Sequence, residues 1–215
     1  MPQRPPTRAV PSKKRAAAPH QVRLIAGTWK RTPLPILDTV ALRPTPSRVR
    51  ETIFSWLTHL LANNWESVTC LDLFAGSGAL GFEAASRGAM RTVLVEQHGA
   101  VFQQLEAIRR RLDAQHVEVL CGDAQMIVQR LQASRQRFNL IFLDPPYALD
   151  WLLRILPACA DLLSEGGIVY AEAEYALDGD KAPDWMRDWE VIRSGKAGQV
   201  FFHLLQRLST VEIEA

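Results

Sequence analysis

The sequence has few of the side chains that build disulfides and metal sites. Its three cysteines, Cys70, Cys121 and Cys159, are far apart, with no Cys-x-x-Cys pair and no histidine at ligand spacing. Such spacing speaks against a disulfide framework and against a zinc site. We therefore expect small core cysteines and no metal ion. His98 and His116 flank a predicted helix, and we expect both at the surface.

Long apolar runs are also missing. No stretch approaches the ~20 consecutive apolar residues that a membrane span requires. Residues 1–20 lack the apolar run of a secretion signal and instead combine basic residues with five prolines: Pro2, Pro5, Pro6, Pro11 and Pro19. We expect a cytoplasmic protein that has no membrane partner.

Acidic residues are almost absent from the first 50 positions. This part holds one acid, Asp38, and eleven of the 25 Lys and Arg, which leaves fourteen basic residues against twenty-two of the 23 acids in the rest. A basic segment joined to a mildly acidic body favours a polyanionic partner, and nucleic acid is the natural candidate. For residues 1–20 taken alone, a merely solvated, disordered tail is an equally good interpretation.

Two short apolar segments open the folded part of the chain. Val22 to Ile25 and Leu34 to Leu37 are separated by Gly27 and Pro33, which predicts a small hairpin or extended arm over residues 21–44.

A helix is expected after this arm. Thr45 is a candidate N-cap, and Pro46 suits the first helical position. Arg48 and Arg50 lie off the apolar stripe, which recurs at helical spacing: Val49, Ile53, Trp56, Leu57, Leu60 and Leu61.

From residue 70 onward, apolar runs alternate with amphipathic helical patterns. This alternation predicts an α/β fold with a doubly wound, mostly parallel sheet of the Rossmann type. Strands are expected at Cys70 to Phe74, Thr92 to Glu96, Val117 to Cys121, Asn139 to Leu143 and Ile168 to Glu172, and helices at Ala79 to Arg87, Val101 to Leu112 and Trp151 to Leu163.

The last part of the chain departs from that alternation. Trp189 to Arg193 and Val200 to Gln206 resemble strands, and the glycines between them leave no room for a helix. We expect a terminal antiparallel hairpin that completes a seven-stranded sheet. Methyltransferase versions of the Rossmann sheet end in this way.

A glycine-rich loop follows the first parallel strand, where bare backbone can approach a ligand. Glu96, at the end of the second strand, can accept hydrogen bonds from the ribose of an adenosine cofactor. Asp72 can hold loop amides or meet a cationic ligand, which favours S-adenosylmethionine over a dinucleotide. Asp123 can accept from an adenine amine, although it is also a candidate helix N-cap. The expected cofactor-binding residues are Asp72, Phe74, Ala75, Gly76, Ser77, Gly78, Glu96, Asp123 and Ala124.

The tetrapeptide Asp144-Pro145-Pro146-Tyr147 follows the fourth parallel strand, at the edge where such sheets bind ligands. An exocyclic base amine is a poor nucleophile because its lone pair is delocalised into the ring. The Asp144 carboxylate and the Pro145 carbonyl can each accept one N–H and stabilise the charge that develops on the amine. Pro146 biases the segment toward an extended form, and Tyr147 can stack on an unstacked base. We interpret these four as the catalytic residues of amine methylation, with no metal required.

The sequence resembles the bacterial 16S ribosomal RNA (guanine-N2)-methyltransferase family, whose members are class I, S-adenosylmethionine-dependent methyltransferases. The resemblance covers residues 22–206. It lies in the blocks Val22 to Trp29, Arg43 to Thr45, Arg48 to Leu57, Leu71 to Gly81, Asp144 to Tyr147 and Gly198 to Val200. The tetrapeptide is shared with enzymes that act on other amines, so the N-terminal blocks are the specific ones. Lys30 to Pro33 and Ala41 depart from the family pattern.

The resemblance implies methylation of a guanine N2 amine in 16S ribosomal RNA of the small (30S) subunit. It also implies an RNA-contacting arm over 21–44, a methyltransferase domain over 45–208, a C-terminal tail over 209–215 and a monomer. The expected RNA-binding residues are Arg23, Trp29, Lys30, Arg31, Arg43, Arg48 and Arg50. An adenine-N6 methyltransferase acting on DNA or RNA is a second hypothesis, disfavoured because the chain has no room for a target-recognition domain. A non-catalytic, RNA-binding ribosome-assembly factor is a third.

Overall fold

The computed structural model describes residues 21–37, 45–146, 150–179 and 182–208. One mixed sheet carries the fold, and a two-stranded hairpin precedes it. The strands are β1 (Gln21–Arg23), β2 (Pro33–Pro35), β3 (Thr69–Asp72), β4 (Arg91–Glu96), β5 (Val117–Cys121), β6 (Phe138–Leu143), β7 (Leu163–Ala173), β8 (Trp189–Ala197) and β9 (Val200–Arg207). The helices are α1 (Ser47–Leu60), α2 (Gly81–Ser86), α3 (Gly99–Arg111), α4 (Ala124–Ala133) and α5 (Trp151–Ala160), with short 3₁₀ helices at Trp65–Ser67 and Asp184–Met186.

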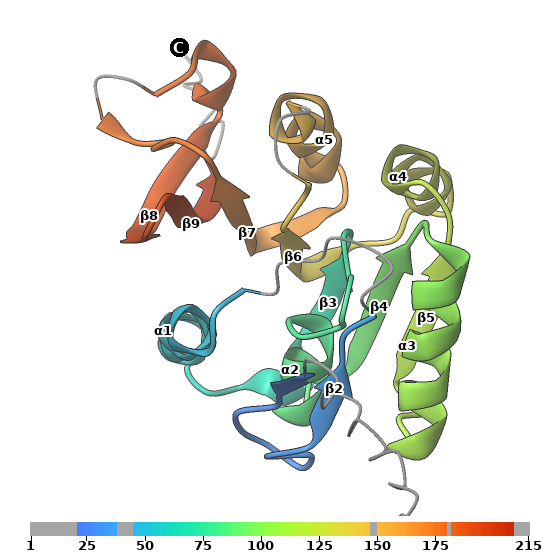
Figure 1. Ribbon diagram of the computed structural model, residues 1–215. Helices are drawn as coiled ribbons and strands as arrows, with labels where there is room; N and C mark the ends of the chain where they lie inside the picture. The colour runs from blue at the N-terminus through green and yellow to red at the C-terminus, as the bar shows by residue number, and fades with distance from the viewer. Residues whose placement is uncertain (1–20, 38–44, 147–149, 180–181, 209–215) are drawn as a thin grey trace, which may run out of the picture.

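The large sheet has seven strands in the order β5-β4-β3-β6-β7-β9-β8 (Figure 1). Strands β3 to β7 pair in parallel, and β9 runs antiparallel to both β7 and β8. The predicted doubly wound, seven-stranded sheet with an antiparallel C-terminal part is therefore confirmed. Among the described residues, no helix is long and apolar enough to cross a membrane.

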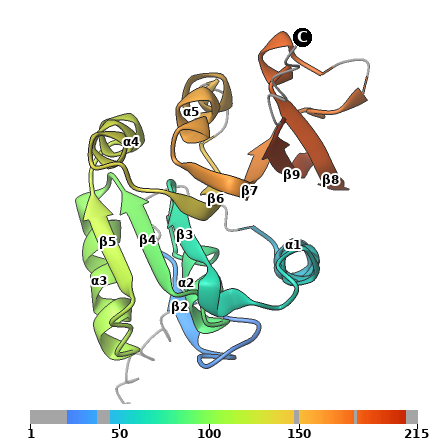
Figure 2. The same cartoon turned by 180° about the vertical axis from the view of Figure 1, so that it is seen from behind.

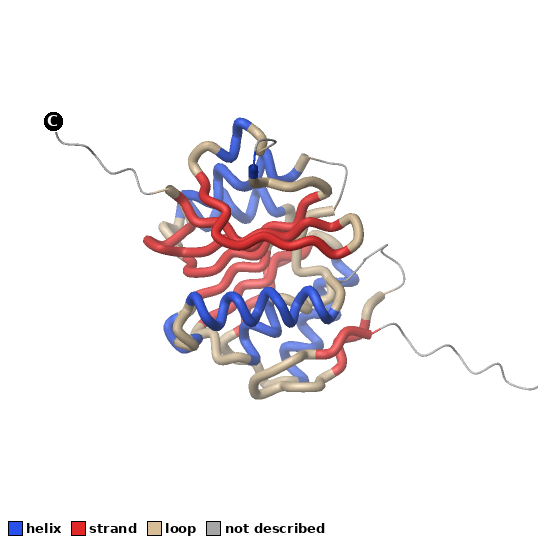
Figure 3. The backbone as a smooth tube through the Cα atoms, turned by 90° about the vertical axis from the view of Figure 1, so that its left-hand side faces the viewer, coloured by secondary structure: helices blue, strands red, loops and turns tan. Residues whose placement is uncertain are grey.

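Helices cover both faces of this sheet (Figure 3). Side chains alternate between the faces along each strand, so Cys70 packs with α1 whereas Leu71 packs with α4 and α5. Strand β6 is buried on both faces, as its continuous apolar run predicted. Cys70 and Cys159 are core residues, but Cys121 is exposed at the end of β5, contrary to expectation.

Some helices and strands begin or end at other residues than the side-chain pattern predicted. Strand β7 begins at Leu163, the last residue of the segment predicted as a helix, and Leu163 pairs with Phe138 of β6. Helix α4 was not predicted, although its buried residues follow helical spacing: Ala124, Ile127, Val128 and Leu131. Helix α1 begins at Ser47, and the Thr45 side chain makes no capping hydrogen bond. The predicted N-cap at Thr45 is therefore wrong, and its hydroxyl has other partners, described below.

The hairpin of β1 and β2 lies against α2, as two opposite views show (Figures 1 and 2). The fully buried Glu83 carboxylate accepts hydrogen bonds from the amides of Ile25 at 2.6 Å and Ala26 at 3.0 Å. Arg87 donates to the same carboxylate at 2.9 Å. The described part of the predicted arm, residues 21–37, is thus docked on the molecule, because its main chain satisfies a carboxylate that the fold buries. The rest of the predicted arm lies outside the described residues.

Gly27 makes this docking possible. Its φ of +77° is unfavourable for other residues, and a Cβ there would stand 1.7 Å from the Ser86 carbonyl oxygen. Ser86 also accepts from Trp29 N at 2.9 Å through Oγ, and donates to Ala26 O at 2.6 Å. The turn can therefore approach α2 closely only without a side chain at position 27.

Candidate active site

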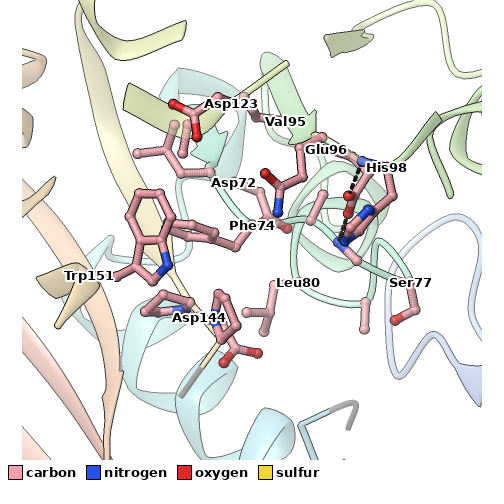
Figure 4. A pocket seen from close by; sticks show the side chains of 18 of the residues that line it. Asp72, Phe74, Ser77, Leu80, Val95, Glu96, His98, Asp123, Asp144 and Trp151 are labelled. Carbon is pink, nitrogen blue, oxygen red and sulfur yellow. Dashed lines mark hydrogen bonds between the residues drawn. The ribbon is translucent and has the colours of Figure 1, made fainter. Parts of the chain in front are cut away.

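A cavity of about 270 Å³ opens at the carboxyl ends of β3, β4 and β6. This is the edge at which open α/β sheets bind ligands. Asp144, Glu96 and Asp123 border it from different sides, with Phe74 between them (Figure 4). The structure brings together most of the predicted site residues in this cavity: Asp72, Phe74, Ala75, Gly76, Ser77, Glu96, Asp123, Ala124, Asp144, Pro145 and Pro146.

Glu96 holds the glycine loop against the end of β4. Its Oε2 accepts from Gly76 N at 3.1 Å, and its Oε1 accepts from His98 N at 2.8 Å (Figure 4). The side chain is 7% exposed, and that exposure is into the cavity that it lines. Both oxygens are therefore oriented by backbone amides before any ligand arrives, which pre-organises the acceptor.

Asp72 lies deeper, at the end of β3. Its Oδ2 accepts from Gly81 N at 3.0 Å, whereas its Oδ1 is buried and has no hydrogen-bond partner among the described residues. Burial raises the pKa of Asp72 to about 7; the nearby amides of Gly81 and Phe74 partly oppose this effect, and the negative charge of Glu96 adds to it. A buried carboxylate with an unused oxygen at a cavity wall favours a cationic ligand, whose charge would stabilise the ionised form.

Asp123 is a helix N-cap, which was the alternative interpretation of this residue. It is the N-cap of α4, and Oδ1 accepts from Gln125 N at 2.9 Å and Met126 N at 3.2 Å. Asp123 also lines the cavity, so capping fixes the direction in which this carboxylate faces a ligand. Contact with an adenine amine stays a prediction.

Gly78 departs from its prediction because it does not line the cavity. Its φ is +78°, and a Cβ there would stand 2.5 Å from the Phe82 ring and 2.9 Å from Leu105. This glycine serves a tight turn and close packing. A glycine fingerprint in sequence does not distinguish such a position from one that faces a ligand.

The tetrapeptide predicted to be catalytic is described as far as Pro146; Tyr147 lies outside the described residues. Asp144 follows β6 directly and is partly buried. The Thr45 hydroxyl lies 3.2 Å from Asp144 Oδ2 and 2.9 Å from Glu172 Oε1. Burial raises the pKa of Asp144 well above its usual range, and the negative charges of Glu172 and Asp72 raise it further.

Sequence reasoning missed several residues that line the cavity. Gln97 and His98 directly follow Glu96, so the end of β4 was a usable signal, and His98 is exposed as expected. Thr45 and Trp151 come from distant parts of the chain and carried no such signal. The Trp151 ring packs edge-on against Phe74, with centroids 5.4 Å apart. The missed lining residues are Thr45, Leu73, Ala79, Leu80, Val95, Gln97, His98, Gly122 and Trp151.

The predicted RNA-binding residues fall into four groups, of which buried Arg50 is described last. Arg23, Lys30, Arg31 and Arg48 are exposed. Trp29 is partly buried and stacks on His116, with centroids 5.6 Å apart, so its ring is already engaged. Arg43 lies outside the described residues.

The prediction that Arg50 is an exposed RNA-binding residue is wrong. The residue is 2% exposed, and its guanidinium donates to Arg23 O at 3.1 Å through both terminal nitrogens and to Thr45 O at 3.3 Å. Burial lowers its pKa. Arg50 therefore joins β1 to the segment before α1 and does not offer its charge to RNA.

The residues present fit S-adenosylmethionine. Asp72 offers an unused carboxylate oxygen to a cation, Glu96 offers oriented acceptors beside the glycine loop, and Phe74 provides an apolar surface between them. A sheet of this order defines a class I methyltransferase fold, and the site at the ends of its parallel strands suits S-adenosylmethionine.

The chain belongs to the family described as Conserved hypothetical protein 95, which matches residues 22–206. It is 36% identical over 197 residues to ribosomal RNA small subunit methyltransferase D of Escherichia coli strain K12, covering 91% of this chain and 94% of that protein. The solved structure of the Escherichia coli protein yhhF is 37% identical, covers 87% of this chain and 98% of its own, and has a TM-score of 0.73. The solved structure of SMU.776 complexed with SAH supports the fold alone, at 15% identity and a TM-score of 0.57 over 70% of this chain and 48% of its own.

Proposed function

We propose that this protein methylates the exocyclic N2 amine of a guanine in 16S ribosomal RNA of the small ribosomal subunit. The observation that carries the proposal is the placement of Asp144 and Pro145 on one wall of the cavity that Asp72 and Glu96 also line. The resemblance of the whole domain to small-subunit methyltransferase D supports the choice of substrate. We expect the protein to act as a monomer in the cytoplasm, where its substrate is found.

The chain's own groups would prepare the amine for attack. S-adenosylmethionine supplies a methyl group bonded to a positively charged sulfur. Ionised Asp144 accepts one N–H of the base amine, and the Pro145 carbonyl accepts the other. These two acceptors favour the pyramidal amine, whose lone pair then points away from the ring. Pro146 has no N–H to compete for the carbonyl, and the enclosed cavity orients the reactants.

Four exposed basic residues are suited to hold RNA: Arg23, Lys30, Arg31 and Arg48. Their side chains can neutralise phosphates, and the counterions released on binding would supply affinity. Because the hairpin is held against α2, the charges of Arg23, Lys30 and Arg31 are presented in a fixed arrangement and lose less conformational entropy when RNA binds.

Small subunits that lack this modification, incubated with the protein and labelled S-adenosylmethionine, test the proposal. We expect label on a single guanine of 16S RNA, and hydrolysis to nucleosides should release N2-methylguanosine. Label on an adenine would favour the N6 hypothesis. Binding of subunits without any transfer of label would favour a non-catalytic assembly factor.

A further inference from the structure

Glu172 lies beside the proposed catalytic carboxylate, on the neighbouring strand. Strands β6 and β7 are paired in parallel up to Leu143 and Ala171, so the next residues along the two strands are Asp144 and Glu172. Glu172 is 4% exposed. The function proposed above assigns it no role, yet a buried carboxyl is costly to retain without one.

Counting hydrogens shows that the cluster around Glu172 holds a proton. The Thr45 hydroxyl has one hydrogen, but its oxygen lies within hydrogen-bond distance of both Asp144 Oδ2 and Glu172 Oε1. Thr45 can donate to only one of them. For both contacts to be hydrogen bonds, the other carboxyl carries a proton and donates it to Thr45 Oγ1. Tyr170 donates a further hydrogen bond to Glu172 Oε1 at 2.6 Å.

The charges around the pair support a shared proton. Burial raises the pKa of both Asp144 and Glu172, while the hydroxyls of Tyr170 and Thr45 oppose the rise at Glu172. A hydrogen bond between the two carboxyls raises the pKa of Asp144 further and lowers that of Glu172. From β3, Asp72 adds negative charge that acts on Asp144. Two adjacent buried carboxylates of like charge cannot both be ionised without large cost.

Elements packed on the other sides of the pair do not change this balance. On β9, Phe202 is the residue paired with Glu172, and the next residue, His203, points to the opposite face, where its ring nitrogen accepts from Leu177 N. From α1, Arg50 reaches Thr45 through the carbonyl oxygen of that residue and not through its hydroxyl.

We propose that Glu172 is a positioning residue of the methyl-transfer site, which shares one proton with Asp144 through the Thr45 hydroxyl and so sets the pH above which Asp144 is ionised and can accept from a base amine. The proposal rests on the function proposed above. The exchange is balanced: as the proton of Asp144 Oδ2 passes to Thr45 Oγ1, the hydrogen of Thr45 passes to Glu172 Oε1. The pair carries one negative charge before and after.

The pH dependence of single-turnover methyl transfer to small subunits tests this role. The rate should fall as the pH drops and Asp144 takes up a proton. Glu172→Gln removes the negative charge that raises the pKa of Asp144, so the acid side of the profile should move to lower pH. Thr45→Val removes a donor that lowers this pKa, so the acid side should move to higher pH. Thr45→Ser keeps the hydroxyl and should keep the wild-type profile.

These opposite shifts separate a positioning role from a structural one. At the pH where the wild-type rate is half its plateau, Glu172→Gln should lie above half of its own plateau and Thr45→Val below half. A residue that only supports the fold would lower the plateau and leave the midpoint in place. Unmoved midpoints in both variants, or movement in the same direction, would overturn the proposal.

An infrared titration of buried carboxylic-acid bands gives a second measurement that needs no substrate. Coupled carboxyls titrate in two macroscopic steps that belong to the pair. The wild type should show these in addition to the step of Asp72 near 7, and Glu172→Gln should lose one of them. Identical titrations of the two proteins would contradict proton sharing. If the wild type methylates no subunit RNA, the proposed function fails, while this titration still decides whether the proton is shared.

Discussion

Two regions of the molecule bury a glutamate, and they do so in different ways. Beneath the hairpin, the Glu83 carboxylate is met by two backbone amides and a guanidinium, all of which donate and keep their hydrogens. At the candidate active site, Glu172 contacts the hydroxyls of Thr45 and Tyr170, and Thr45 links it to the carboxyl of Asp144. Glu83 therefore holds the architecture through groups that only donate to it. Glu172 lies in a cluster whose proton can move, which suits a group that must respond to a substrate.

The largest expected effect is on the rate of methyl transfer at the candidate active site. Asp144→Ala removes an acceptor for the amine, and we expect the transfer rate to fall by about a hundredfold to a thousandfold, or about 3 to 4 kcal/mol. Calorimetric titration should show that the variant still binds S-adenosylmethionine, and its free energy of unfolding should change by about 1 kcal/mol or less. A variant with full activity would contradict the proposed role of Asp144.

Beneath the hairpin, we expect a substitution to lower stability instead of the transfer rate. Glu83→Gln places a donor group where amides and Arg87 already donate, so we expect the free energy of unfolding to fall by about 3 kcal/mol, measured by urea denaturation. Glu106→Gln is the matched control, because Glu106 pairs with Arg109 on the surface of α3. That change should cost about 0.5 kcal/mol or less. Equal losses in the two variants would show that the hairpin contact contributes little.

The next largest expected effect is a change in cofactor affinity with pH. Asp72 has a pKa of about 7 in the free protein, and a cationic ligand should bind its ionised form. Affinity for S-adenosylmethionine should then rise about tenfold from one pH unit below that pKa to one unit above it. Calorimetry of Asp72→Asn should give weaker binding without this rise. A flat profile in the wild type would show that Asp72 does not meet the cation.

The smallest effect compares exposed with buried arginines. Replacing Arg23, Lys30 and Arg31 together by alanine should slow transfer to subunits by roughly fivefold and reduce its dependence on salt concentration. Arg50→Ala should instead lower the free energy of unfolding, because the carbonyls of Arg23 and Thr45 lose their donor. If Arg50→Ala reduced the salt dependence of the transfer rate more than the triple variant does, Arg50 and not the exposed residues would be the RNA-binding group.

These contrasts explain what could be predicted from the sequence. Strands such as β6 were predictable because burial on both faces demands a continuous apolar run. Asp72, Glu96 and Asp144 were predictable because the ends of parallel strands meet at one edge of the sheet. Each of these features depends on local sequence and on the order of the elements.

The errors concern contacts between distant segments. Arg50 lies off the apolar stripe of α1, which predicts a surface position, but β1 covers it and supplies a carbonyl. Gly78 fits a ligand-binding fingerprint, but Phe82 and Leu105 occupy the space beside it. Glu172 ends a predicted strand like any other residue, and only strand register places it beside Asp144. Helix α4 is different, since its spacing was readable and was overlooked.

The docking of the hairpin on Glu83 also sets an order of events during synthesis. The two are 58 residues apart in the chain, so the ribosome makes the hairpin well before its partner. At about 5 to 20 residues per second, the delay is roughly 3 to 12 seconds. A nascent chain stalled before α2 should expose a hairpin open to protease, and cleavage there should cease once Glu83 has left the exit tunnel.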